Sequence, residues 1–260
     1  MLNRLRQYWQ RQREERALER RAIPDALWAL TLERYPFLAN RSEDDRSELR
    51  RLASLFLDEK EFTGIDGFVV TDDIAVAVAA QACLPVLRLG LESYHSFVGI
   101  VMHADEVVAQ RTHVDEAGVV HHYDEVLTGE AMEGGPVMLT WNDVRDAGEL
   151  ASWAYNVVIH EFAHVLDMTD GVSDGVPLLP TQAARAQWLE VLLPEYDRFA
   201  ERVVCGHETV LDPYGAESPD EFFAVASEAF FVAPLGMKKE QPALYRLLSS
   251  YYRQDPAAAW

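Results

Sequence analysis

Residues 153–167, with the sequence WAYNVVIHEFAHVLD, constrain the fold of this chain more than any other segment. Their apolar side chains recur at helical spacing, and the segment carries the pattern HExxH at His160, Glu161 and His164. On a helix, residues four positions apart lie one turn above each other, so both imidazoles can face one metal ion. The surrounding apolar residues predict a buried helix, and buried charges need partners.

This spacing is typical of a zinc site in which Glu161 takes a proton from a zinc-activated water. An open catalytic zinc site has three protein ligands, so one more is required. The best candidates lie in residues 213–231, where Glu221 and Glu228 share one face of a predicted helix. Ser218 and Glu221 also match the S-x-x-E capping box, which would tie this carboxylate to the backbone. Spacing alone therefore leaves the role of Glu221 open.

Two further polar residues belong to the same predicted helix. Asn156 lies four residues before His160, and Asp167 lies three residues after His164. Either side chain could fix the orientation of an imidazole, or could simply lie on the helix surface. The other histidines lack paired spacing, and we expect structural or solvent-exposed roles for them: His95, His103, His113, His121, His122 and His207.

The composition argues against several other classes of protein. The 260 residues carry a formal net charge of −20, so a phosphate backbone would be repelled and direct nucleic-acid binding is not expected. Cys83 and Cys205 form neither a disulfide framework nor a thiolate zinc pattern. No apolar run is long enough to span a membrane, and the N-terminus lacks the apolar core of a signal peptide. We therefore expect a cytoplasmic protein.

The remaining pattern predicts an α+β fold. Residues 1–22 form a basic arm, and residues 23–260 are expected to form one domain. Its first part, about 23–85, shows helical spacing, whereas the sheet and the active-site helices are expected within about 86–260. We expect a mostly antiparallel sheet flanked by helices.

Individual elements follow from local spacing. β-branched and apolar runs from VLRLGL at 86–91 onwards predict four or five strands. Helical spacing returns over about 149–168, over 181–203 and from Pro219 through Phe231.

Two segments near the motif could shape a binding site. Residues 134–141, GGPVMLTW, could offer an exposed strand edge to an extended peptide, although an interior hairpin strand fits the same pattern. The acidic loop over residues 167–180 could act as a lid, and a closed lid would leave the site inactive.

The motif HEFAH at 160–164, the pair YG at 214–215 and the run EFFA at 221–224 together resemble the Mlc titration factor A family of metallopeptidases. The same layout is similar to the catalytic domain of anthrax lethal factor. The resemblance covers most of the chain and includes the segments IPDALWALTLERYPFL, LFLDEKEFTG, AAQACLPVLRLGL, GPVMLTW and PALYRLLSSYYRQDP.

The resemblance implies a zincin-like fold and one Zn²⁺ per chain, with Glu221 as the third ligand beside His160 and His164. It also implies that Tyr214 stabilises the oxyanion of a tetrahedral intermediate. Glu228 is then left outside the zinc ligands, where it could orient an imidazole or be paired elsewhere.

The implied activity is that of a cytosolic zinc metallopeptidase, aminopeptidase-like, which hydrolyses short peptides with Glu161 as general base. The resemblance also implies a link to the glucose-responsive repressor Mlc. The alternative is a binding protein that sequesters a transcriptional repressor, with catalysis secondary. An acidic protein suits this second role, because it can compete with DNA for a basic face.

Overall fold

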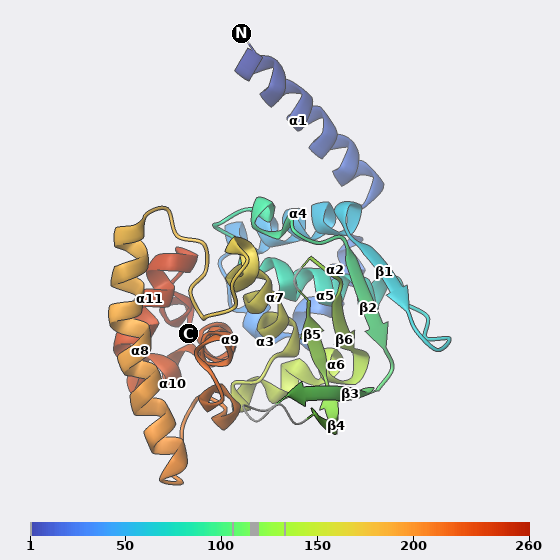
Figure 1. Ribbon diagram of the computed structural model, residues 1–260. Coiled ribbons are helices and arrows are strands. Elements are labelled where there is room, and N and C mark those ends of the chain that lie inside the picture. Colours follow the sequence, from blue (N-terminus) through green and yellow to red (C-terminus); the bar gives the residue numbers. More distant parts are fainter. Residues whose placement is uncertain (1, 106, 115–119, 133) are drawn as a thin grey trace.

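The structure is a computed structural model that describes residues 2–105, 107–114, 120–132 and 134–260. It shows a mixed α+β architecture, as expected, in which helices surround a small sheet (Figure 1).

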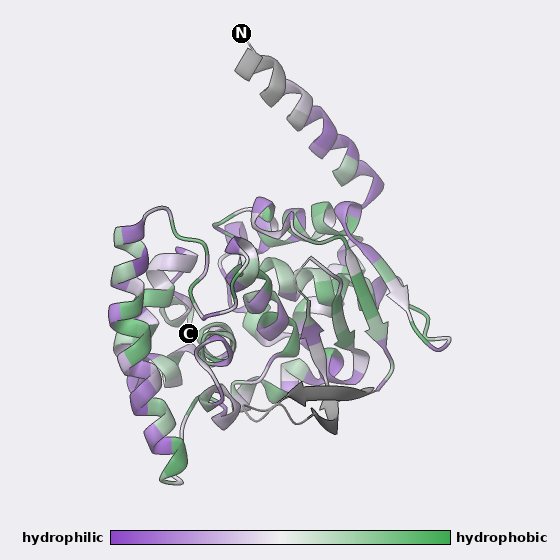
Figure 2. Ribbon diagram, viewed as in Figure 1, coloured by the Kyte–Doolittle hydropathy of each residue, from purple (hydrophilic) through white to green (hydrophobic). Residues whose placement is uncertain are grey.

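The N-terminal part is helical, as predicted, but it also holds a strand that the sequence did not reveal. Its elements are α2 (Asp25–Arg34), α3 (Pro36–Ala39), α4 (Glu43–Glu59), β1 (Glu61–Gly64) and α5 (Asp72–Cys83). Helix α4 begins where the Ser42 side chain accepts a hydrogen bond from the Asp45 N–H, and acidic residues fill its first turn. Helix α5 is buried from Val76 to Cys83 and forms part of the apolar centre of Figure 2.

Helix α1 (Leu2–Arg20) contains most of the basic arm and projects away from the body (Figure 1). Its last turns attach to α4, because Ala17 is buried and Arg20 pairs with Asp58 at 2.8 Å. Glu14 lies 3.3 Å from Arg51. Exposed pairs of this kind contribute less than about 1 kcal/mol each, so apolar contact at Ala17 matters as much as the charges.

The main sheet has the strand order β1-β2-β6-β5. Its other strands are β2 (Gly99–His103), β5 (Gly129–Ala131) and β6 (Val137–Thr140), and a separate antiparallel hairpin joins β3 (Val107–Val114) to β4 (Val120–Leu127). The pairs β1–β2 and β2–β6 are parallel, whereas β5–β6 is antiparallel.

The prediction of a mostly antiparallel sheet is therefore wrong for the main sheet. Parallel neighbours need long crossover connections, and the chain supplies them with α5 between β1 and β2 and with the hairpin between β2 and β6. Strand β6 is paired on both sides, so of the two alternatives for residues 134–141 the exposed edge is excluded and the interior strand is confirmed. The edge strand on this side is β5.

The helix expected over residues 149–168 is divided into three elements. Helix α6 (Trp141–Leu150) is followed by the 3₁₀ turn η2 (Ala151–Trp153), and α7 (Val157–Asp167) begins only after a break. Ala154 has a φ of 59°, which ends the first helical path. Asn156 then caps the second helix, because its side chain accepts a hydrogen bond from the Ile159 N–H.

The C-terminal part is helical, and its two longest helices agree with the predicted ranges. Its elements are η3 (Met168–Asp170), α8 (Gln182–Val204), η4 (Pro213–Ala216), α9 (Pro219–Val232), α10 (Pro234–Glu240), α11 (Pro242–Tyr252) and η5 (Pro256–Ala259). Helix α9 is buried from Phe222 to its end, and Phe230 stacks on Tyr252 with ring centroids 5.5 Å apart. Helix α7 contacts α9, α5 and strand β5, which places it at the centre of the fold.

The strand expected at residues 86–91 is absent from the structure, which has turns there, followed by the 3₁₀ helix η1 (Leu91–Tyr94). The backbone N–H of Gly90 donates to the Val86 carbonyl at 2.8 Å, and Val86 and Leu87 are buried. The apolar run thus reflects burial of a turn rather than strand pairing.

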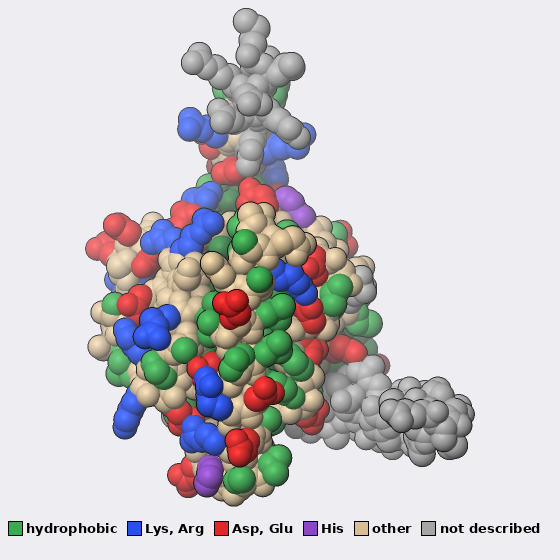
Figure 3. Space-filling model, turned by 60° about the vertical axis from the view of Figure 1, so that its left-hand side comes forward, with side chains coloured by type: hydrophobic (Ala, Val, Ile, Leu, Met, Phe, Trp, Pro, Cys, Tyr) green, Lys and Arg blue, Asp and Glu red, His purple; other side chains and the backbone are tan. Residues whose placement is uncertain are grey.

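In the part of the chain that the structure describes, no helix combines the length and apolar character that crossing a membrane requires. On the face shown in Figure 3, acidic and basic side chains are interspersed. Among the described residues of that face, the basic side chains form no continuous stripe of the kind on which a phosphate backbone would bind.

Candidate metal centre

Helix α7 brings the two histidines of the motif together in a buried setting. His160 and Glu161 are 9% and 5% exposed, and the two imidazole rings lie 4.8 Å apart between centroids. The Nε2 atoms of His160 and His164 are 3.2 Å apart. The predicted geometry of the pair is confirmed, although α7 begins later than the sequence suggested.

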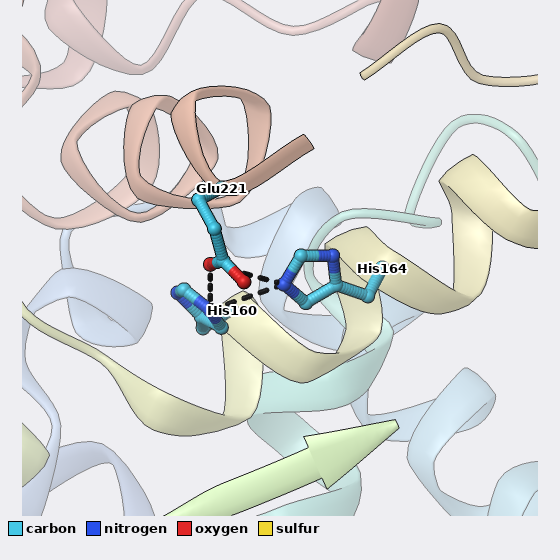
Figure 4. Close-up of side chains that lie close together, drawn as sticks. All are labelled: His160, His164 and Glu221. Carbon is cyan, nitrogen blue, oxygen red and sulfur yellow. Dashed lines mark hydrogen bonds and ion pairs between the residues drawn. The ribbon is translucent and has the colours of Figure 1, made fainter. Parts of the chain in front are cut away.

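Helix α9 supplies the carboxylate that faces these rings (Figure 4). The helix begins with Pro219 in its first turn and with Ser218 as cap, whose hydroxyl accepts from the Glu221 N–H at 3.5 Å. This is the N-cap half of the capping box. The Glu221 carboxylate turns towards the imidazoles, with Oε2 at 3.1 Å from His160 Nε2 and 3.4 Å from His164 Nε2.

These three atoms fit a metal ion. Zinc ligands about 2.0–2.1 Å from the ion at tetrahedral angles are separated from each other by roughly 3.3 Å. The separations of 3.2, 3.1 and 3.4 Å match that value. Glu221 Oε2 is buried and makes no hydrogen bond of good geometry within the described residues. Two nitrogens and one such oxygen are the donor set that zinc prefers, so His160, His164 and Glu221 could hold it.

Glu228 lies about two turns after Glu221 on α9 and contacts the other ring nitrogen of His160. Its Oε1 lies 2.7 Å from His160 Nδ1, and its Oε2 accepts a hydrogen bond from the Asn156 N–H. A carboxylate on Nδ1 fixes the ring so that Nε2 faces Glu221. Sequence spacing left this role undecided, and the structure shows the contact.

The histidines and carboxylates of the cluster shift each other's pKa values. Burial alone would lower the pKa of His160, but the Glu221 and Glu228 carboxylates hold the pKa of this imidazole well above its usual value. Burial acts in the opposite direction on Glu221, yet the two histidines bring the pKa of its carboxyl well below the usual range. The site is therefore built to hold positive charge between these groups.

Glu161 lies next to this cluster, but the pKa of its carboxyl is raised, unlike that of Glu221. Desolvation raises the pKa of its carboxyl to about 7, against the opposing pull of His160 and His164. Strand β5 packs directly on it, because a Cβ at Gly129 would come within 3.0 Å of the Glu161 carboxylate. A glycine at this position lets the strand and the carboxylate approach each other.

Tyr214 lies in η4 with its side chain 43% exposed, and its ring centroid is 6.1 Å from that of His160. Asp212 fixes the turn, because its Oδ1 accepts from the Tyr214 N–H at 2.9 Å. Tyr214 borders two cavities of about 320 and 240 Å³, both of which are also bordered by His160 and Glu161. Tyr214 thus lies beside His160 and along both cavities, and its part in catalysis stays a prediction.

Asn156 and Asp167 are fully buried, so a helix-surface position is excluded for both. The Asn156 side chain donates to Gln81 at 2.8 Å and caps α7, and only its backbone reaches Glu228. Within the described part of the chain, neither side chain forms a hydrogen bond with an imidazole. Their effect on the histidines is therefore indirect.

Asp167 attaches the acidic loop after α7. Its Oδ2 accepts from the Gly175 N–H at 2.8 Å, and the Ser173 hydroxyl lies 3.4 Å from it and 3.2 Å from Asp220 Oδ2. Trp188 of α8 donates to the Gly175 carbonyl at 2.9 Å. The loop thus connects α7, α8 and the start of α9, which carries Glu221.

Two residues that shape the site, Gly129 and Gln81, could not be predicted from the sequence. Gly129 lies in a three-residue strand, where a glycine gives no indication of what packs on it. Gln81 lies on a different helix, 75 positions before its partner Asn156. Only the tertiary fold brings these residues to the site.

A mixed α+β fold with two histidines on one helix and a carboxylate from a later helix has the layout of a metallopeptidase. Residues 8–253 match the family of glucose-regulated metallo-peptidases M90. The uncharacterized protein slr2042 of Synechocystis sp. is 35% identical over 245 residues, which are 93% of this chain and 88% of the relative. Mlc titration factor A of Pectobacterium atrosepticum is 34% identical over 226 residues, 86% of this chain and 84% of the relative.

A second protein of that name, from Escherichia fergusonii, is 34% identical over 224 residues, 85% of this chain and 83% of its own length. The chain belongs to the M90 metallopeptidase family, which includes the proteins named Mlc titration factor A.

The contact between Glu228 and His160 predicts an effect on metal affinity. Replacing Glu228 by Gln weakens the hold on Nδ1, and loss of such a partner typically costs about 10–100-fold in metal affinity. We expect Glu228→Gln to fold normally and to bind Zn²⁺ more weakly by this factor in a chelator competition. Unchanged affinity would show that the carboxylate is dispensable for the ring.

The close packing at Gly129 predicts a loss of activity without loss of metal. A methyl group in Gly129→Ala displaces the Glu161 carboxylate, and a shift of about 1 Å in a reacting group can reduce turnover roughly 100-fold. Zinc content should equal that of the parent protein. A variant with full peptidase activity would contradict the proposed place of Glu161 in the reaction.

Burial of the Asp167 carboxyl predicts that the free energy of unfolding depends on pH. Burial raises the pKa of its carboxyl from 3.8 to about 6, so the ionised form is destabilised in the folded chain. That penalty, at most about 3 kcal/mol, is present at pH 7, decreases as the pH falls through 6, and is absent below about 4. Urea unfolding with chelator present should show Asp167→Asn to be more stable at pH 7 but not at pH 4. Equal differences at both values would contradict the assignment.

Proposed function

We propose that this chain is a zinc-dependent, aminopeptidase-like peptidase of the cytoplasm that uses one Zn²⁺ per chain. The observation that carries the proposal is the convergence of His160 Nε2, His164 Nε2 and Glu221 Oε2 at 3.1–3.4 Å from each other. Their separations suit a zinc ion, and the HExxH helix adds a carboxylate beside it.

In the proposed mechanism each side chain has one task. A bound zinc ion supplies Lewis-acid polarisation of the scissile carbonyl and makes a water acidic near neutral pH. Glu161 takes the proton from the attacking water and passes it to the leaving amine. Glu228 holds His160 through Nδ1, so that the ring keeps its orientation during the reaction.

Tyr214 is the proposed hydrogen-bond donor to the developing oxyanion. Its ring lies beside His160 at the mouth of both cavities, where a bound carbonyl would lie. A donor aimed at the charge that appears in the transition state contributes more to turnover than to substrate binding.

The experiment for this proposal compares aminoacyl and peptide chromogenic substrates with and without a chelator. Metal-dependent hydrolysis that returns on adding Zn²⁺ supports the assignment. Hydrolysis that persists in the metal-free protein, or none with any peptide, would overturn it.

A second candidate function is sequestration of a transcriptional repressor. Three observations favour it: relatives that are 34% identical over most of this chain are named for titration of Mlc, the formal net charge is −20, and one face shows no basic stripe. An acidic protein can compete with DNA for the basic face of a repressor. Binding of an Mlc-like repressor by Glu161→Gln, measured without turnover, would separate this role from catalysis.

A further inference from the structure

The cavity of about 320 Å³ beside the proposed metal centre has an unusual combination of walls. Val157, Val225 and the ring of Tyr155 supply apolar surface, whereas Asp212, Glu161 and Glu228 supply carboxylates. Its volume is at the small end of ligand pockets, which suits one side chain better than a whole peptide. His160 and Glu161 form part of its wall, so a side chain bound there would belong to a residue close to the scissile bond.

Carboxylates outnumber the basic side chains around this cavity. It adjoins the smaller cavity of about 240 Å³, and the two share Gly129, His160, Glu161 and Tyr214. Among the described residues that line either one there is no lysine or arginine, whereas six carboxylates do so: Glu130, Glu161, Asp212, Asp220, Glu221 and Glu228. The proposed metal ion would neutralise only part of this charge, so a positively charged ligand is favoured.

Three of these six carboxylates already have a task in the site. Glu221 faces the two histidines, Glu228 holds His160 and the Asn156 N–H, and Glu161 is the proposed base. Asp212 is different, because it is half-buried at the wall and, within the described residues, its Oδ1 accepts a hydrogen bond only from the Tyr214 N–H. A carboxylate has about four acceptor positions, so Asp212 retains the capacity to bind a ligand cation.

We propose that this cavity selects substrates with a lysine or arginine next to the scissile bond, and that Asp212 binds the positive end of that side chain. The apolar walls suit the aliphatic stem of such a residue, whose charged end then reaches the carboxylate. A free α-amine has no stem to fill the cavity, which is why a side chain is the better occupant. This inference deepens the proposed peptidase function and rests on it.

The test uses a substitution that changes only charge. Asp212→Asn keeps an oxygen acceptor for the Tyr214 N–H but removes the carboxylate. Peptides that are identical except for lysine or norleucine, placed in turn on each side of the scissile bond, are compared by kcat/KM. We expect the parent protein to prefer lysine on one side by about tenfold, the scale of a hydrogen bond to a charged group. Asp212→Asn should lose that preference, so that the ratio of kcat/KM between the lysine and the norleucine peptide falls to about one.

Asp220→Asn is the matched control, because it removes a carboxylate from the adjoining cavity only. It should retain the lysine preference. If Asp220→Asn loses the preference, or if Asp212→Asn keeps it, the assignment to Asp212 is overturned.

A binding measurement separates this inference from the proposed reaction. Calorimetry with N-acetyl-lysine amide and N-acetyl-norleucine amide requires no turnover, so it can be done even with a catalytically silent protein. Tighter binding of the lysine compound, lost in Asp212→Asn, supports the inference. Equal or undetectable binding of the two compounds would overturn it, whatever the outcome for peptide hydrolysis.

Discussion

Replacing Glu161 by Gln should abolish peptide hydrolysis while leaving the metal in place. The carboxylate is the proposed proton carrier, and removal of a general base typically costs about 10²–10⁴-fold in rate. Glutamine has nearly the same size, so the packing of Gly129 on this side chain should be preserved. The measurement is kcat/KM with a chromogenic peptide in the zinc-saturated variant.

The control for Glu161→Gln is its zinc content and its urea unfolding curve, both of which should match those of the parent protein. Glu161 does not belong to the three converging donor atoms, so no ligand is lost. Full peptidase activity in the purified variant would remove Glu161 from the mechanism.

Replacing Glu221 by Ala should cost the protein its metal. Structural zinc sites bind with about 10–16 kcal/mol in total, so one ligand of several accounts for roughly 3 kcal/mol or more, at least a 100-fold loss of affinity. We expect purified Glu221→Ala to contain little zinc and to show no metal-dependent hydrolysis. The same loss is expected for His160→Ala and His164→Ala.

Asp220→Asn provides the matched control for Glu221→Ala, since it changes a carboxylate at the neighbouring position of the same first turn. Its side chain points to Ser173 and should leave zinc affinity near that of the parent protein. Stoichiometric zinc in Glu221→Ala would mean that another carboxylate is the third ligand.

How much the sequence could predict differs between residues of the site. The face shared by His160 and His164 follows from the period of a helix, and so does the neighbouring place of Glu161. Glu221 could not be assigned in this way, because Ser218 and Glu221 fit a capping box equally well. In the structure the cap and the turn of Glu221 towards the histidines coexist, since the backbone N–H and the carboxylate act separately.

In the fold, too, local features could be predicted from the sequence and non-local ones could not. The helical N-terminal part and the long helices α8 and α9 were evident from apolar spacing, which is a local property. The direction of strand pairing is not local, and strand β1 and the parallel order of the main sheet were missed for that reason. The break at Ala154 was missed as well, because alanine is a good helix former and only the tertiary structure imposes its positive φ.

Membership of the M90 family indicates the class of site but not its substrate or partner. It makes a metallopeptidase site the natural interpretation of the HExxH helix, but substrate and partner depend on particular side chains of this chain. The cavity bordered by Asp212 and the binding of a repressor concern two separate properties, and each has an experiment of its own.

The most direct test of the central claim is anomalous X-ray scattering from crystals of the zinc-loaded protein, recorded on both sides of the zinc edge. The account predicts one strong peak per chain, about 2.0–2.2 Å from His160 Nε2, His164 Nε2 and a Glu221 carboxylate oxygen. A peak at other residues, or none at these three in zinc-saturated crystals, would contradict it.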